Sequence, residues 1–152
     1  RLRACAGDDL AITTDVIAGF PGETDEEFEE SLAFCAEMRF AQMHVFPYSK
    51  RTGTLAARMP DQVPHATKHA RVQRMLALAR ESRAAYLERF TGRALPVLWE
   101  RRRNDADGAG AWDGLTDNYI RVTARSSRDL RNTITAARLV AVRDGGFDGE
   151  VL

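Results

Sequence analysis

The chain has 152 residues, of which 44% are hydrophobic and 29% are charged, and its 22 basic and 22 acidic residues balance. This composition predicts a soluble globular protein of one domain or two small ones. No stretch approaches the roughly 20 apolar residues that a membrane span needs and no signal peptide opens the chain, so we expect a cytoplasmic protein with no membrane partner.

The balanced total hides an uneven distribution of charge. Residues 1–63 carry 6 basic and 11 acidic side chains, whereas residues 64–93 carry 7 basic and 2 acidic ones. An acidic front and a basic middle would suit a polyanion such as nucleic acid. Helices with a solvated arginine face are also common, so charge alone leaves both interpretations open.

An apolar run that ends in a glycine turn opens the chain, with the sequence TTDVIAGFPGE over residues 13–23. Thr24 and Glu27 then have the spacing of a capping box, which predicts the start of a helix. Strand, tight turn and helix together form a βα unit. Parallel α/β folds build their sites at such turns, beyond the carboxyl end of the strand.

The pattern continues as a second strand and a long helix. Residues 42–48 read as a short strand that ends in a polar turn at 49–54, so residues 12–48 form a βαβ unit. A helix is expected over about residues 65–90, ended by Gly92. The predicted core faces of the two helices are Phe28, Leu32 and Cys35, and then Val72, Met75, Leu76, Ala79, Tyr86 and Phe90.

After residue 94 the helical period disappears. Short apolar runs at 95–100, 119–123, 133–142 and 147–152 alternate with turn clusters, one of them a glycine- and aspartate-rich loop at 104–114. This spacing predicts a small antiparallel barrel or sandwich. We place a domain boundary near residues 92–95.

Two strand ends carry residues suited to binding. Glycines at 19 and 22 would let backbone approach a ligand, although an ordinary βα turn needs them equally. The second strand end, residues 44–54, is rich in donors and suits an anionic or carboxylate-bearing ligand. A solvated loop would have the same composition.

The last domain combines basic and aromatic side chains. Arginines surround Trp99, Trp112 and Tyr119, which suits single-stranded RNA, but aspartates at 105, 107, 113 and 117 dilute the positive charge. Cys5 and Cys35 are the only cysteines, and they form neither a CxxC pair nor a disulfide framework. No metal site is predicted.

These motifs resemble one family. ITTDVIAGFPGETDEEFEESLAF followed by HVFPYSKRTGT looks like the later part of the radical S-adenosylmethionine barrel of methylthiotransferases. The tail, with VLWE and GLTDNYIRV, is similar to the TRAM domain, the RNA-binding β-barrel of those enzymes. The resemblance implies an α/β plus all-β chain: residues 1–92 as the last βα units of a partial TIM-like barrel ending in a long helix, and residues 93–152 as a small antiparallel, OB-like TRAM barrel.

The resemblance also implies a reaction. HVFPYSKRTGT is most similar to the branch that modifies N6-threonylcarbamoyladenosine, which implies addition of a 2-methylthio group next to the anticodon, at position 37 of tRNA. The implied cofactors are S-adenosylmethionine and two 4Fe–4S clusters, and the implied partner is the tRNA anticodon stem-loop. The alternatives are a branch acting on isopentenyladenosine tRNA or on a ribosomal protein, and a non-catalytic RNA-binding module.

The chain departs from this family in one respect. The family's CxxxCxxC motif, whose thiolates hold a cluster, is absent. We therefore expect a carboxyl-terminal fragment, without catalytic residues or metal ligands, that is inactive without the amino-terminal part of the same protein. By resemblance, the cofactor-binding residues are Asp15, Gly19, Gly22, Glu23 and Ser49, and the substrate-binding residues are His44, Tyr48, Lys50, Arg51, Arg101, Tyr119 and Arg121.

Overall fold

The structure is a computed structural model that describes residues 2–103 and 110–152. The chain forms two compact units. One is Ile12–Arg83, and the other combines the residues up to Ala11 with Ala84–Leu152. The division falls inside the long helix α3 (His65–Glu88), which therefore contributes residues to both units.

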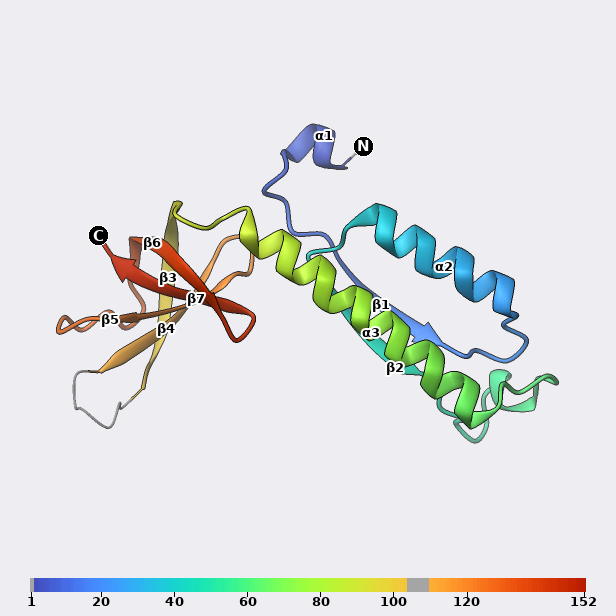
Figure 1. The fold of residues 1–152 in the computed structure, drawn as a ribbon. Helices are drawn as coiled ribbons and strands as arrows, with labels where there is room; N and C mark the ends of the chain where they lie inside the picture. Colours follow the sequence, from blue (N-terminus) through green and yellow to red (C-terminus); the bar gives the residue numbers. More distant parts are fainter. Residues whose placement is uncertain (1, 104–109) are drawn as a thin grey trace. The chain divides into compact units, whose positions relative to one another are not determined.

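The first unit is built on two parallel strands and two helices (Figure 1). Its elements are β1 (Thr13–Ala18), α2 (Asp25–Met38), β2 (Gln42–Pro47), the short 3₁₀ helix η1 (Ala56–Arg58) and the first part of α3. The register pairs Thr13 with Gln42 and Ala18 with Pro47. Both strands therefore end at the same edge, and the loops that follow them lie next to each other.

The two faces of this sheet differ. Side chains of a β-strand alternate between faces, and the core cluster takes one face only. The residues packed on that face, from β1, β2, α2 and α3, include Val16, Ala18, Met43, Val45, Phe28, Cys35, Val72, Met75 and Ala79. This cluster confirms the predicted apolar face of α2 and that of α3 as far as Ala79. Tyr86 and Phe90 are buried as predicted but lie outside the cluster.

The opposite face of the sheet is open in the described chain. Ile17 and Phe46 are paired across the strands and remain 57% and 51% exposed. Asp15 and His44 form the neighbouring pair on the same face, and both are exposed. Parallel sheets are usually covered on both faces, so the open side with its mixed polar and apolar residues is unusual.

Helix α2 begins as its sequence predicts. The Thr24 hydroxyl accepts a hydrogen bond from the Glu27 amide (3.1 Å), and the Glu27 carboxylate accepts one from the Thr24 amide (2.9 Å). The helix ends at Arg39, whose φ of 47° lies in the left-handed region. The amide of Arg39 donates to the Cys35 carbonyl oxygen and closes the last turn.

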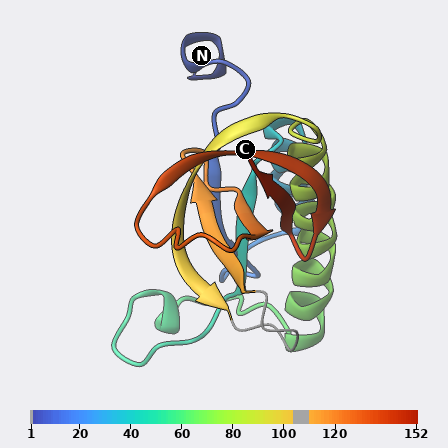
Figure 2. The ribbon, with the colours of Figure 1, turned by 90° about the vertical axis from the view of Figure 1, so that its left-hand side faces the viewer.

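The second unit contains a closed five-stranded barrel (Figure 2). After α1 (Leu2–Ala6), its strands are β3 (Ala94–Arg103), β4 (Ala111–Thr116), β5 (Arg121–Arg125), β6 (Ile134–Arg143) and β7 (Gly146–Val151). They close in the order β3-β4-β5-β7-β6. All neighbouring pairs are antiparallel except β5 and β7, which run parallel.

Two tryptophans fill the barrel. Trp99 and Trp112 are 0% and 1% exposed. The indole N–H of Trp99 donates to the Thr135 hydroxyl at 2.8 Å, which satisfies a polar group that would be costly to bury alone. The indole N–H of Trp112 is buried and has no partner among the described residues.

Three details of the sequence-based prediction were wrong. The predicted loop 104–114 contains the start of β4, because Ala111 and Trp112 are buried between β3 and β5; residues 104–109 lie outside the described residues. The barrel is not wholly antiparallel, because β7 enters between β5 and β6. The long helix ends at Glu88, not at residue 90.

No helix among the described residues is both long enough and apolar enough to cross a membrane.

Candidate functional site

The turn after β1 is built by two glycines with positive φ, 76° at Gly19 and 85° at Gly22. L side chains are strained in this region. The amide of Gly22 donates to the carbonyl oxygen of Asp61 at 2.9 Å, and that of Glu23 to Phe20 at 3.0 Å. The turn is thereby tied to the loop that precedes α3.

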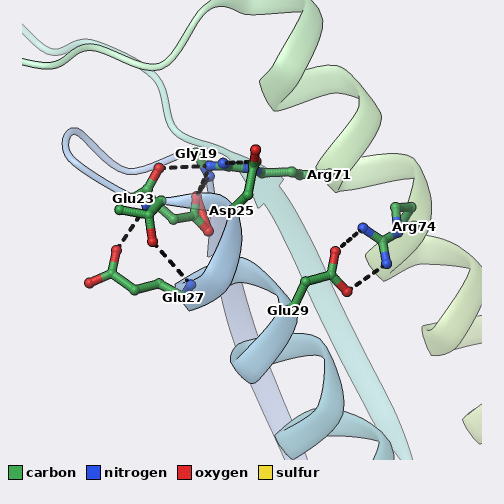
Figure 3. Close-up of polar contacts among 8 residues, drawn as sticks. Gly19, Glu23, Asp25, Glu27, Glu29, Arg71 and Arg74 are labelled. Carbon is green, nitrogen blue, oxygen red and sulfur yellow. Dashed lines mark hydrogen bonds and ion pairs between the residues drawn. The ribbon is translucent and has the colours of Figure 1, made fainter.

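A buried arginine holds the same turn from α3 (Figure 3). The side chain of Arg71 is 7% exposed. It donates to the Glu23 carbonyl oxygen (3.0 Å), to the Glu23 carboxylate (3.1 Å) and to the Asp25 carboxylate (2.6 Å). The Glu23 carboxylate also accepts a hydrogen bond from the Gly19 amide. The carboxylate of Glu23 therefore holds the turn together from within.

The arginine stays charged in this position. Burial acts to lower the pKa of Arg71, but the hydrogen bond to Asp25 and the charges of Glu23 and Asp25 outweigh it, so the pKa is raised. One turn further along α3, Arg74 binds Glu29 through both of its terminal nitrogens (Figure 3). The hydrogen bond from Arg74 lowers the pKa of the Glu29 carboxyl.

The end of β2 lies directly against this turn. The amide of Tyr48 donates to the Ala18 carbonyl oxygen at 2.8 Å, and the rings of Tyr48 and Phe20 meet edge to face at 5.4 Å. Lys68 of α3 donates to the Tyr48 carbonyl oxygen at 3.4 Å and lies 5.7 Å from the centre of its ring. The Tyr48 hydroxyl is buried without a partner among the described residues.

A pocket of about 360 Å³ opens between this strand end and the first turns of α3. Its lining contains three of the residues expected to bind cofactor or substrate, Tyr48, Ser49 and Lys50. Arg51 follows them in an exposed turn outside the lining, where its carbonyl oxygen accepts a hydrogen bond from Thr54 (2.8 Å). The remaining lining residues are Pro47, His65, Lys68, His69 and Val72.

Asp15 and His44 are in a different place from the pocket residues. They are neighbours on the open face of the sheet, and His44 shares a hydrogen bond of 3.3 Å with Gln42. The expected site residues of the first unit thus occupy four positions: the glycine turn, the pocket, the exposed turn with Arg51, and the open face of the sheet.

The barrel carries its own hollow, of about 1250 Å³. Arg101 and Arg121 both line it, together with Arg103, Arg125 and Arg143. Tyr119 does not line it but stands 71% exposed in the turn between β4 and β5, with φ of 60°. Five acidic residues balance these arginines in the lining: Glu100, Asp113, Asp144, Asp148 and Glu150. The Asp113 carboxylate lies 3.4 Å from Arg101 and 3.3 Å from Arg103, and that of Asp148 lies 3.4 Å from Arg143.

The thiols do not assemble into a metal site. Cys5 is exposed on α1, whereas Cys35 is buried in the core of the first unit, where burial raises its pKa. Across residues 2–103 and 110–152, no group of three or more histidine, cysteine or acidic side chains could hold a metal ion.

The sequence analysis did not single out two residues of this region, Arg71 and Lys68. Both belong to the helix whose charges left two interpretations open; Arg71 is 6% exposed and Lys68 lies over Gly19. Their spacing did contain a signal, because Arg71 precedes Val72 and Met75 on the predicted apolar stripe. A charge at the edge of such a stripe is a candidate for an internal ion pair.

Comparison with known proteins finds tRNA-modifying enzymes among those that this chain is similar to. It is 41% identical over 131 residues to the threonylcarbamoyladenosine tRNA methylthiotransferase MtaB of Bacillus subtilis, covering 86% of this chain and 29% of that protein. It is 35% identical over 143 residues to the tRNA-2-methylthio-N(6)-dimethylallyladenosine synthase of the same organism, covering 93% of this chain and 28% of that protein. The synthase of Caldicellulosiruptor saccharolyticus is 43% identical over 103 residues, which cover 66% of this chain and 22% of that protein.

The chain therefore spans less than a third of the length of these relatives. A scan against protein-family models gave no match.

Proposed function

The chain belongs to the tRNA methylthiotransferases of the radical S-adenosylmethionine family, and from this premise we propose that it is the carboxyl-terminal part of an enzyme that adds a 2-methylthio group to N6-threonylcarbamoyladenosine at position 37 of tRNA. The main support is the 41% identity, over 86% of the chain, to the Bacillus subtilis threonylcarbamoyladenosine tRNA methylthiotransferase, whose name contains that nucleoside. The HVFPYSKRTGT string at the second strand end supports the same branch.

A second candidate substrate has a specific observation in its favour. Two of the relatives are dimethylallyladenosine synthases, one of them 43% identical over 103 residues. Both candidates share the chemistry and the position on tRNA that we propose. They differ in the group on N6, which carries a carboxylate in one case and is apolar in the other.

The first unit fits a place beside S-adenosylmethionine. Gly22 is exposed at one strand end, the Tyr48 hydroxyl is buried at the next without a partner among the described residues, and Asp15 lies on an open sheet face. We assign Asp15, Gly19, Gly22 and Ser49 to cofactor binding, with Glu23 shaping the turn. His44, Tyr48, Lys50 and Arg51 would face the substrate. When bound, the cofactor would supply the radical and the methyl group.

The iron–sulfur clusters do not fit this chain. One thiol is exposed and the other is buried in an apolar core, and a cluster needs several thiolates close together. We therefore place the cluster ligands in the amino-terminal part of the same protein, and derive no step through a cluster here. On this view the chain by itself is inactive.

The barrel would hold the RNA. We propose that residues 93–152 are a TRAM domain and residues 1–92 the end of the catalytic barrel, in a cytoplasmic enzyme. Arg101 and Arg121 share one hollow and would contact phosphates of the anticodon stem-loop. Tyr119 is exposed two residues before Arg121 in the sequence and would stack on a base.

The test is nucleoside analysis of tRNA from a strain that lacks the parent gene. We expect N6-threonylcarbamoyladenosine to lose its 2-methylthio group while dimethylallyladenosine keeps it, and the parent gene to restore it. Loss on dimethylallyladenosine instead would favour the second candidate. Unchanged 2-methylthio content of both nucleosides would refute methylthiotransferase activity.

A control variant distinguishes the loss of a cofactor-binding residue from a general loss of structure. Asp15→Asn in the full-length enzyme removes a charge on the open face without changing the size of the side chain, and should abolish modification. Thr13→Val, a change on the same face two residues earlier in β1, should leave it intact. Equal loss in both variants would indicate a structural effect.

A further inference from the structure

The pocket between β2 and α3 has an unusual charge distribution. Four of its eight lining residues are basic or can become so: Lys50, His65, Lys68 and His69. No carboxylate lines it, and within the described chain none of these four side chains takes part in an ion pair. In a region that otherwise pairs its arginines with acids, these charges remain available.

Lys68 is held in place at this pocket. Its stem lies so close to Gly19 that a Cβ built there would stand 2.2 Å from the Lys68 Cγ. Its ammonium has one long hydrogen bond, of 3.4 Å, to the Tyr48 carbonyl oxygen. A lysine ammonium has three N–H donors, so two remain for a ligand. The glycine turn therefore positions a cation whose bonding capacity is mostly unused.

The rest of the lining is apolar. Pro47, the ring of Tyr48 and Val72 supply surface between the basic groups, and α3 begins at His65 on the rim. The amino-terminal end of a helix favours negative charge. The volume of about 360 Å³ is in the range of small-molecule sites. A ligand that matches this lining has an anionic group and a flat apolar part.

We propose that this pocket binds a nucleotide unit, with its phosphate on Lys50 and Lys68 and its base against Pro47 and Tyr48. The first unit would then grip RNA at a place separate from the barrel hollow. The inference rests on the proposed function only in naming single-stranded RNA, rather than a free nucleotide, as the source of that unit.

The test follows backbone amide resonances of the isotope-labelled chain during titration with adenosine 5′-monophosphate, adenosine, inorganic phosphate or a short single-stranded RNA. We expect the amides of residues 48–50 and 65–69 to shift, and the monophosphate to bind more tightly than adenosine or inorganic phosphate. Adenosine binding as tightly as the monophosphate, or shifts confined to other residues, would overturn the proposal.

Matched variants assign the charge. Lys50→Met and Lys68→Met, the latter keeping the stem over Gly19, should each weaken monophosphate binding about fivefold. Arg80→Met removes the same charge from an exposed position of α3 outside the pocket and should have no effect. Since Lys50 is exposed, its variant tests the proposal even if Lys68→Met destabilises the chain. Equal weakening by all three would refute a specific site.

The RNA arm decides the source of the nucleotide. Shifts of the same amides with RNA would support the chain as an RNA-binding surface, whereas shifts with the monophosphate alone would assign the pocket to a free nucleotide. None of these titrations measures methylthio transfer. A negative titration would therefore not contradict the proposed enzymatic function, and a negative nucleoside analysis would not contradict nucleotide binding in this pocket.

Discussion

Arg71→Met should destabilise the first unit far more than the same change at Arg74. The two arginines lie one turn apart on α3, at 5.5 and 5.1 Å from the centre of the same Phe28 ring, and each is paired with acids of α2 or its preceding turn. They differ in burial, since the side chains are 7% and 50% exposed. The comparison therefore isolates the effect of burial.

The magnitude follows from what each change leaves behind. Loss of Arg71 leaves the Glu23 carboxylate, 14% exposed, with only the Gly19 amide as partner. An uncompensated buried charge costs about 3–5 kcal/mol. The retained amide and some access to water reduce this to about 2–3 kcal/mol. The contact with Asp25 contributes little, because that side chain is 89% exposed.

In the ion pair of Arg74 with Glu29, both side chains are exposed to solvent. We expect its variant to unfold at nearly the same urea concentration as the parent chain, because exposed ion pairs are weak.

The assay must distinguish the two units, since a chain of this kind need not unfold in one step. Both tryptophans are buried in the barrel, so their fluorescence reports the barrel alone. The helical circular-dichroism band reports chiefly α2 and α3. We expect the Arg71 variant to shift the helical transition and to leave the fluorescence transition in place.

A second substitution checks the cause. Arg71→Met leaves the Glu23 carboxylate without its arginine partner, and Glu23→Gln removes that negative charge. The double variant should therefore lose less stability than the sum of the two single variants. Additive losses, or equal losses for the variants of Arg71 and Arg74, would refute the argument from burial.

Three further predictions concern the barrel and the thiols. Binding of an anticodon stem-loop should weaken as the salt concentration rises. Arg121→Ala should lower the slope of log K against log salt by about one, whereas Tyr119→Ala should keep the slope and weaken binding by roughly 1–3 kcal/mol. Salt-independent binding would contradict both. Gly114→Ala should destabilise the fluorescence transition by about 1–3 kcal/mol, because its Cβ would stand 2.5 Å from a backbone oxygen of β3; an unchanged midpoint would show that β3 moves freely. In the native chain a thiol reagent should label Cys5 at once and Cys35 only on unfolding, since burial raises the pKa of Cys35; rapid double labelling would place Cys35 at the surface.

Local signals in the sequence were sufficient for the first unit. The capping box of α2 spans four consecutive residues, and both of its hydrogen bonds form as predicted. The apolar stripes of α2 and α3 identified most of the core, because a helix repeats its faces at a short, fixed interval. These features depend on neighbours in the sequence, and they were predictable for that reason.

Long-range pairing was harder to predict. Residues 111–114 contain a glycine and an aspartate and were assigned to a loop, yet they form part of β4 because strands on both sides supply partners. Gly114 fits there since β3 approaches too closely for a side chain. The burial of Arg71 was missed for the same reason: its partners lie 46 and 48 residues away.

The candidate site was predictable in its outline. Both strand ends were predicted to carry binding residues. Parallel topology makes them neighbours, and the hydrogen bond from Tyr48 to Ala18 joins them. The part of the pocket that α3 supplies could not be predicted from the sequence. Whether Lys68 points to the pocket or to solvent depends on how α3 packs on the glycine turn.

The position of β7 in the barrel has a consequence for synthesis on the ribosome. This strand is the last of the chain's described elements, yet it lies between β5 and β6 and pairs with both. Before it emerges, the other four strands can form only an open sheet in the order β6-β3-β4-β5, with a bare edge at each end. Bare edges recruit other strands, so a nascent chain stalled before residue 146 is expected to be prone to co-translational aggregation, and the last strand acts as the barrel's own protection against it.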